Sequence, residues 1–360
     1  MKKNFLLFIA MISMIVIFSA CSSSGDNGES SNESSSGEET TENGTEETGS
    51  SGETIEIIAN AIYPESNHVT QGMIEFSEKV EEATGGKVKI VVNSDGALGY
   101  EGPELLKAVR DNSVTISDVL TSNVVGDEPL FGISTLPFIS QNFDEGKVFI
   151  DVARPYYEQV AEEKWNQKVL FGVSWPYAGF WTQDPVETID DLKGKKMRTY
   201  DENGALVVQA AGGVPSPLPF SEVYSGLQTG VIDSVLTSSP TAVDAKFWEV
   251  LDYYVPTKVT AAYSIITMNL DEFNKLDQET QDIMMEIGKE MDEIMWQRNL
   301  ELDEEMEATV VENGIEILEP SQEFMDDWAA IGKEIADEWL QNAPAEAQEI
   351  IDQYNAEVGR

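Results

Sequence analysis

The sequence predicts an α/β fold of two lobes, each a mixed sheet flanked by helices. From residue 56 to 121, strand-like and helix-like segments alternate as β-α-β-α-β, the pattern of a mostly parallel sheet. A second β-α-β unit follows at residues 195–217. Between the two units, residues 174–185 (SWPYAGFWTQDP) gather aromatic side chains beside Pro and Gly, which indicates the crossing from one lobe to the other.

The first lobe is predicted from short segments of contrasting periodicity. Strands are expected where β-branched or alternating apolar residues occur, at residues 56–59, 88–92, 115–121 and 168–174. Helices are expected where apolar residues recur at helical spacing, at residues 69–84, 102–112 and 140–165. A further strand at residues 265–269 is expected to return to this lobe.

The second lobe follows the same rules. Strands are expected at residues 195–199, 214–217 and 234–237, with helices at 202–211, 220–229, 324–342 and 345–357. Residues 278–312 form a helical pattern without Pro, about 50 Å long, which is expected to span both lobes. Residues 54–174 plus about 262–300 are assigned to the first lobe, and 175–261 plus about 301–360 to the second. Two lobes that the chain crosses repeatedly predict a cleft that closes on a ligand.

The N-terminus predicts export. Lys2 and Lys3 precede an apolar run at residues 5–18, and small residues follow, so residues 1–20 are interpreted as a signal peptide. The run is about 14 residues, whereas a transmembrane helix needs about 20. Residues 18–21 (FSAC) resemble a bacterial lipobox, which predicts Cys21 as a lipidated N-terminus; cleavage after Ala20 without lipidation is the alternative. Cys21 is the only cysteine, so no disulfide forms within the chain.

Residues 22–53 contain only Ser, Gly, Glu, Thr, Asn and Asp. Such a segment has no apolar side chains to bury, so residues 21–53 are expected to be a lipidated cysteine followed by a disordered acidic tether. The whole chain has a formal net charge of −44, which argues against nucleic acid as a partner.

The residue types argue against catalysis. The chain has one histidine, His68, and one cysteine, so neither a nucleophile–base pair nor a zinc site is evident. No Gly-rich nucleotide motif follows a strand. No cofactor, no metal and no enzymatic activity are therefore expected. A secreted enzyme that uses carboxylates is the less favoured alternative.

Arg198 is the strongest candidate for ligand binding. It lies at the end of the strand expected at residues 195–199. Its guanidinium is always charged and presents a planar fork of donors, which suits a carboxylate.

Several motifs resemble the substrate-binding proteins of tripartite ATP-independent periplasmic (TRAP) transporters of the DctP type. The resemblance covers residues 55–292. Its motifs are GGKVKIVVNSDGALG (85–99), STLPFI (134–139), PVETIDDLKGKKMRTY (185–200), GGVPSPLPFSEVYSGLQTGVID (212–233) and AKFWEV (245–250). It implies a two-lobed fold like that of periplasmic binding proteins. It also implies an extracytoplasmic receptor that closes on an organic acid through Arg198 and delivers it to the small and large membrane subunits of a sodium-coupled permease.

Two departures from the family pattern concern the ligand. Many members carry Gly-x-Arg after the crossing, where this chain has Gly179-Phe180-Trp181. Many also carry a GQEN-type run, where this chain has Ser234 to Ser238, with Thr237 as a single donor. A less polar pocket predicts a monocarboxylate with an apolar or aromatic body. The first-lobe candidates are chosen because they lie on loops after strands, where α/β sheets bind ligands. The candidate ligand-binding residues are Arg198, Trp175, Tyr177, Phe180, Trp181, Thr237 and, from the first lobe, Tyr63, Asn67, Tyr100, Ser122 and Asn123.

The expected protein is therefore a monomeric lipoprotein on the outer face of the cell membrane, with a small-molecule carboxylate as ligand. A receptor for an ATP-driven importer or a sensor system is the alternative, which neighbouring membrane-subunit genes would distinguish.

Overall fold

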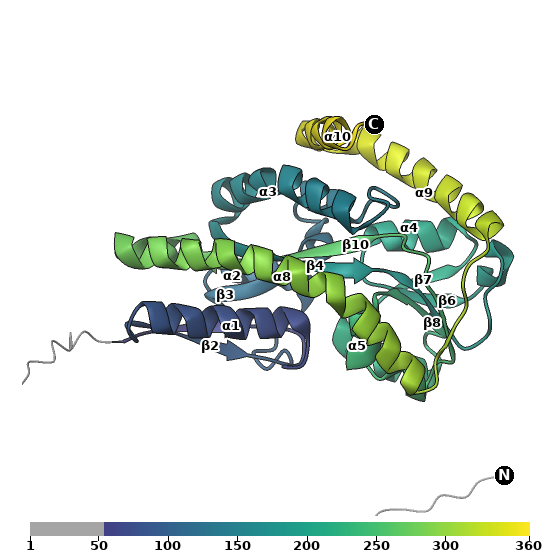
Figure 1. Cartoon of the computed structure of the whole chain (residues 1–360), viewed down its shortest axis with the longest axis horizontal. Helices are drawn as coiled ribbons and strands as arrows, with labels where there is room; N and C mark the ends of the chain where they lie inside the picture. The colour runs from purple at the N-terminus through teal and green to yellow at the C-terminus, as the bar shows by residue number, and fades with distance from the viewer. Residues whose placement is uncertain (1–53) are drawn as a thin grey trace, which may run out of the picture. The chain divides into compact units, whose positions relative to one another are not determined.

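The computed structural model describes residues 54–360, and the predicted signal peptide, Cys21 and tether lie outside the described residues. Two mixed sheets flanked by helices form the described part, which confirms the predicted α/β fold class. A long helix runs past both sheets (Figure 1).

The first lobe is built on a five-stranded sheet of order β2-β1-β3-β10-β4. Its strands are β1 (Ile55–Asn60), β2 (Val88–Asn93), β3 (Ile116–Leu120), β4 (Gln167–Tyr177) and β10 (Ala261–Asn269). β1 is parallel to β2 and β3, whereas β10 is antiparallel to β3 and β4, so the chain returns to this sheet as expected. The accompanying helices are α1 (His68–Ala83), η1 (Gly102–Glu104), α2 (Leu105–Arg110), η2 (Thr121–Val124), η3 (Pro129–Thr135), α3 (Phe143–Trp165) and α7 (Leu270–Lys275).

The second lobe is built on a six-stranded sheet of order β11-β9-β5-β8-β6-β7. Its strands are β5 (Gly179–Thr182), β6 (Lys196–Thr199), β7 (Val214–Pro217), β8 (Ser234–Thr237), β9 (Tyr253–Val255) and β11 (Glu316–Ile317). β6 is parallel to β7 and β8, and β5 is antiparallel to β8 and β9. The helices of this lobe are η4 (Ile189–Leu192), α4 (Glu202–Ala210), α5 (Phe220–Thr229), α6 (Ser239–Asp244) and η5 (Phe247–Glu249).

The crossing between the lobes is more regular than the sequence predicts. β4 continues to Tyr177 and β5 begins at Gly179, so most of the aromatic segment is strand and little of it is loop. Gly179 is required there because a Cβ at this position would lie 2.4 Å from the carbonyl oxygen of Val255. The two lobes are thus joined by strands that change sheets at Ala178.

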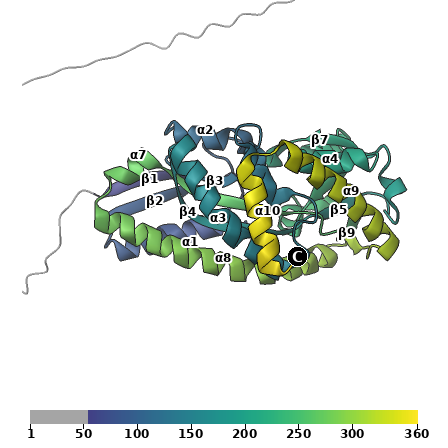
Figure 2. The ribbon, with the colours of Figure 1, turned by 90° about the horizontal axis from the view of Figure 1, so that it is seen from above.

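Helix α8 (Gln278–Glu312) packs on β4 and α1 of the first lobe and on α6 of the second, as expected for a helix that spans both. Helix α9 (Gln322–Asn342) packs on α4, and α10 (Ala345–Val358) packs on α3 (Figure 2). The sequence assigns residues 301–360 to the second lobe, whereas α10 lies on the first, because Ile350 and Tyr354 are buried in the first-lobe core.

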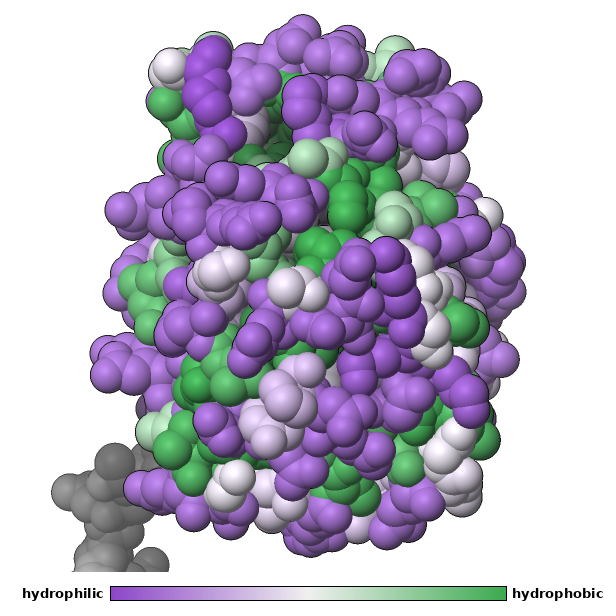
Figure 3. Space-filling view, turned by 90° about the vertical axis from the view of Figure 1, so that its right-hand side faces the viewer, coloured by the Kyte–Doolittle hydropathy of each residue, from purple (hydrophilic) through white to green (hydrophobic). Residues whose placement is uncertain are grey.

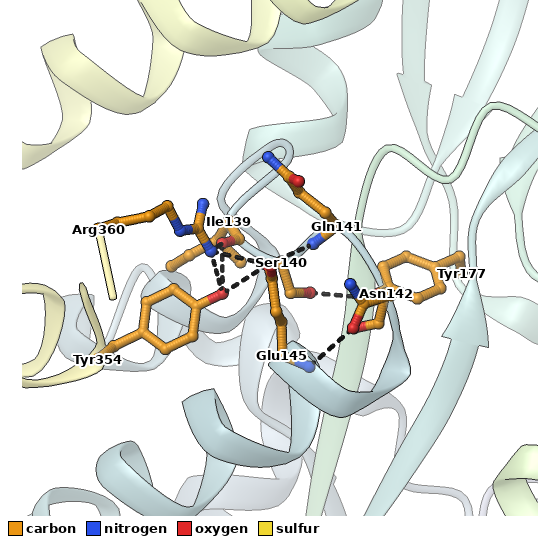
Figure 4. Close-up of polar contacts among 8 residues, drawn as sticks. All are labelled: Ile139, Ser140, Gln141, Asn142, Glu145, Tyr177, Tyr354 and Arg360. Atoms are coloured by element: carbon orange, nitrogen blue, oxygen red, sulfur yellow. Dashed lines mark hydrogen bonds and ion pairs between the residues drawn. The ribbon is translucent and has the colours of Figure 1, made fainter. Parts of the chain in front are cut away.

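A polar cluster holds α10 in that position (Figure 4). The Tyr354 hydroxyl and the Arg360 guanidinium both donate to the carboxylate of Glu145, at 3.2 and 2.7 Å. Nearby, the Tyr177 hydroxyl donates to the carbonyl oxygen of Asn142 at 2.9 Å. The cluster therefore ties α10, the start of α3 and the end of β4 together.

The face at the second-lobe end is mostly hydrophilic, with hydrophobic residues showing in places (Figure 3). Polar cover of this kind accords with the excess of 66 acidic over 22 basic residues in the chain. Between residues 54 and 360, the helices are all too short or too polar to cross a bilayer.

Candidate functional site

A cavity of about 320 Å³ lies between the two sheets. The carboxyl ends of parallel strands meet on the same side of a sheet, which is where α/β proteins bind ligands. Ile62 and Tyr63 reach the cavity just after β1, and Asn123 reaches it after β3. Arg198 and Thr237 reach it from the ends of β6 and β8. Strand ends of both lobes therefore converge on one space.

Arg198 is the cation that faces this cavity. Its side chain is 4 % exposed, and its Nε donates to the carbonyl oxygen of Leu218 at 2.9 Å. The guanidinium carbon lies 5.9 Å from the ring centroid of Tyr200. Burial lowers the pKa of Arg198 to about 10, so the group is still charged at neutral pH. Within residues 54–360 it forms no ion pair, which leaves its terminal nitrogens available for an anion.

Aromatic rings from both lobes form one wall of the cavity. The Tyr63 ring packs edge-on against Trp175 at 5.0 Å and against Phe220 at 5.5 Å. The indole Nε1 of Trp175 donates to the Ser264 hydroxyl at 3.0 Å, which fixes the orientation of this ring. The His68 ring packs edge-on against Trp175 at 4.5 Å, and burial lowers the pKa of His68 to about 3, so it is neutral. The wall is thus apolar and preorganised.

Hydrogen bonds join the two lobes across the cleft. The Asn67 amide, ahead of α1, donates to the carboxylate of Asp244 in α6 at 2.6 Å. The Ser221 hydroxyl in α5 donates to the Glu101 carboxylate at 3.0 Å. Because each pair has one partner in each lobe, the cleft is in a closed arrangement.

Comparisons with known proteins bear on this arrangement. The model of the family described as bacterial extracellular solute-binding protein, family 7 (DctP), matches residues 59–342. The chain belongs to this family. It is a solute-binding receptor of the DctP type.

Two extracytoplasmic solute receptors of Bordetella pertussis that bind pyroglutamic acid, DctP7 and DctP6, resemble this receptor in structure. DctP7 is 29 % identical with a TM-score of 0.82, and the match covers 84 % of this chain and all of DctP7. DctP6 is 27 % identical with a TM-score of 0.80, covering 84 % of this chain and 99 % of DctP6. The 2,3-diketo-L-gulonate-binding periplasmic protein YiaO of Escherichia coli (strain K12) is 25 % identical over 286 residues, which are 75 % of this chain and 82 % of YiaO.

The structure of this receptor brings five of the predicted ligand-binding residues together. The cavity is lined by Arg198, Trp175, Thr237, Tyr63 and Asn123. All five lie at or just after the carboxyl end of a strand, which is the rule by which the first-lobe candidates were chosen.

The structure places two of the predicted aromatic residues in the core. Phe180 packs 5.0 Å from the Trp328 ring of α9, and Trp181 stacks on Tyr254 at 4.0 Å. Both are fully buried, because β5 lies inside the second sheet and has packed elements on both faces. The positions of Phe180 and Trp181 therefore do not support their predicted role as cavity walls.

The remaining predicted residues also lie away from the cavity lining. Tyr177 is held in the α10 cluster, and Asn67 caps α1 by accepting from the Val69 amide at 2.9 Å. Tyr100 packs beside the small cluster around Val109. Ser122 is buried in η2 and does not line the cavity. Asn67 instead contributes to the closed cleft through Asp244.

Sequence reasoning missed several lining residues of this receptor. The second lobe adds Tyr200 and the segment 217–220, and the first lobe adds Glu101 and Glu104. Tyr200 stands two residues after Arg198, where the alternation of a strand returns to the same face. The segment 217–220 begins at the last residue of β7, so the strand-end rule would have found it.

Asp118 is a buried carboxyl in β3, two residues before Leu120, which lines the cavity. Its Oδ1 accepts from the Ile62 amide at 3.4 Å, and Oδ2 has no partner among the described residues. Burial is the main cause that raises the pKa of Asp118 to about 8. The folded protein therefore keeps a proton that the unfolded chain releases near pH 4. The resulting stability is fully present below pH 4 and is lost as the pH rises through 8.

We expect Asp118→Asn to reveal this loss. Asparagine keeps the shape and the Oδ1 acceptor but cannot ionise. The variant should match the wild type at about pH 4 and exceed it in free energy of unfolding by an amount that grows towards pH 9. Urea unfolding at several pH values measures both. A difference that does not change with pH would contradict the assignment.

Proposed function

We propose that this receptor captures a monocarboxylate with a compact body that is apolar or aromatic, or a small ring without hydroxyl groups, with Arg198 as its anchor. The observation that carries the proposal is the buried Arg198 guanidinium, which lines the cavity and forms no ion pair within residues 54–360. A buried charge without a partner is unfavourable, and a bidentate carboxylate would relieve it. The Tyr63, Trp175 and Phe220 rings would then enclose the body of the ligand.

Pyroglutamate is the first ligand to test. It carries one carboxylate on a small ring, which fits a cavity of about 320 Å³, and DctP7 and DctP6 bind it. A thermal-shift screen followed by calorimetry should give hits among monocarboxylates whose body is aromatic, apolar or a small ring without hydroxyl groups. Glucuronate and gulonate serve as the polyhydroxylated comparison. Binding confined to sugar acids or to dicarboxylates would overturn the proposal.

We also propose how the bound acid reaches the membrane. The bound acid would be passed to the small and large membrane subunits of a sodium-coupled TRAP permease, by a monomeric receptor. In support, the chain belongs to a family of solute-binding receptors, not of enzymes.

We further propose that Cys21 anchors the receptor to the outer face of the cell membrane. The support is the FSAC sequence at residues 18–21 and the polar segment that follows it. Two or three acyl chains on such a cysteine hold a protein stably at a bilayer. The full chain should fractionate with membranes and Cys21→Ser should not. Equal membrane association of the two would disprove the anchor.

A further inference from the structure

The charges around the cavity are unequal in number. Among the lining residues described here, Arg198 is the one cation, and the carboxylates of Glu101 and Glu104 are the two anions. Neither glutamate forms an ion pair within residues 54–360, whereas many other acidic side chains of this chain do, for example Glu75 and Glu145. The negative charge of the two glutamates is therefore not neutralised by a neighbouring side chain.

Hydrogen bonds hold both glutamate side chains beside the cavity. The Glu104 carboxylate accepts from the backbone amide of Glu101 at 3.4 Å, so the two side chains belong to one short loop around η1. The Glu101 carboxylate accepts from the Ser221 hydroxyl of α5 at 3.0 Å, across the cleft. Ser221 follows Phe220, whose ring lines the same cavity. Closure of the lobes therefore fixes Glu101 at the edge of the enclosed space.

We propose that Glu101 and Glu104 determine specificity by excluding ligands with a second negative charge. The inference rests on the proposed function, in which Arg198 takes one carboxylate. Once that pair has formed, the lining residues within 54–360 offer no further cation, and a second anionic group meets two carboxylates. Like charges brought together in this way lower the affinity for the wrong partner. A neutral N–H or hydroxyl group of the ligand has no such cost and can donate to Glu101 or Glu104.

The exclusion of a second negative charge should also depend on salt. Glu101 and Glu104 are exposed at the edge of the cavity, so their repulsion of a second charge is screened by ions. The preference for a monoanion over a dianion should therefore shrink as the ionic strength rises. A purely steric exclusion of the second group would not respond to salt.

The test compares matched ligand pairs by calorimetry on the wild-type receptor, Glu101→Gln, Glu104→Gln and the double variant. The pairs are benzoate with terephthalate, and cyclohexanecarboxylate with cyclohexane-1,4-dicarboxylate. The wild type should favour the monoanion of a pair by about tenfold or more. The double variant should lose most of this preference by binding the dianion more tightly. Glu222→Gln is the matched control, because Glu222 is exposed on α5 and does not line the cavity.

Ser221→Ala separates charge from closure. It removes the cross-cleft partner of Glu101 but no charge, so it should weaken both members of a pair alike. A wild-type receptor that binds the dianions as tightly as the monoanions would overturn the proposal. So would a double variant with an unchanged preference, even though monocarboxylate binding is intact. If the wild type binds no monocarboxylate, the proposed function fails and this inference fails with it.

Discussion

Replacing Arg198 by alanine is expected to abolish useful ligand affinity. The variant would leave the ligand carboxylate in the cavity without a charged partner, while the Tyr63, Trp175 and Phe220 rings still surround the body of the ligand. Truncating one member of a buried, hydrogen-bonded charge pair costs about 2–5 kcal/mol, which is roughly 30- to 4,000-fold in Kd. Calorimetry with the best monocarboxylate from the screen measures this loss. The fold should survive, because Arg198 makes a single hydrogen bond to protein, to Leu218, among the described residues.

Two control variants separate geometry from charge. Arg198→Lys keeps the positive charge but loses the planar fork, so it should recover only part of the affinity. Arg110→Ala removes a guanidinium that pairs with Asp111 on the surface, and it should bind like the wild type. Wild-type affinity in Arg198→Ala would contradict the assignment of the anchor.

The strand ends account for what the sequence could predict of the site. Arg198, Tyr63 and Asn123 are predicted from their places at or after strands, and the topology brings such places together. Glu101 does not follow a strand directly. It is one of 66 acidic residues in the chain, so its residue type alone could not mark it as a cavity residue. Its place at the cavity depends on the loop around η1 and on α5 of the other lobe.

The aromatic residues near the crossing show the limit of the sequence argument. Trp175, Phe180 and Trp181 are all large aromatic residues and lie within seven residues of one another. Only the sheet order decides between them. Trp175 is near the end of β4 and faces the cleft, whereas β5 lies between β9 and β8, where both faces are covered. Residue type gives the tendency to be buried, but not whether the neighbour is a helix or a ligand.

The fold could be predicted to a similar depth. Apolar periodicity gave nearly every long helix, including α8 with bounds that match the structure. It could not assign α10 to a lobe, because an amphipathic helix shows that it has a partner but not which one. In the structure, Ile350 and Tyr354 of α10 pack in the first-lobe core.

Helix α8 crosses the first lobe so closely that one methyl group should disturb it. A Cβ on Gly288 would lie 2.2 Å from the carbonyl oxygen of Leu170 in β4 and 3.0 Å from its carbonyl carbon. Both atoms belong to the backbone of a strand paired with β10, so they cannot move aside as a flexible side chain can. α8 itself is held by α1 and α6, and a shift away from β4 would therefore strain its contacts in both lobes.

Gly288→Ala is thus expected to destabilise the protein although alanine favours helices. Helix propensity alone predicts a gain of about 1 kcal/mol. Overpacking against a fixed backbone costs about 1–3 kcal/mol or more, and a contact of 2.2 Å points to the upper end, so the net effect should be a loss. Urea unfolding measures whether the free energy of unfolding falls or rises. Gly126→Ala is the control, since a Cβ there meets nothing within 4 Å and the backbone needs no positive φ. A Gly288→Ala variant that is more stable than the wild type would contradict the close contact between α8 and the backbone of β4.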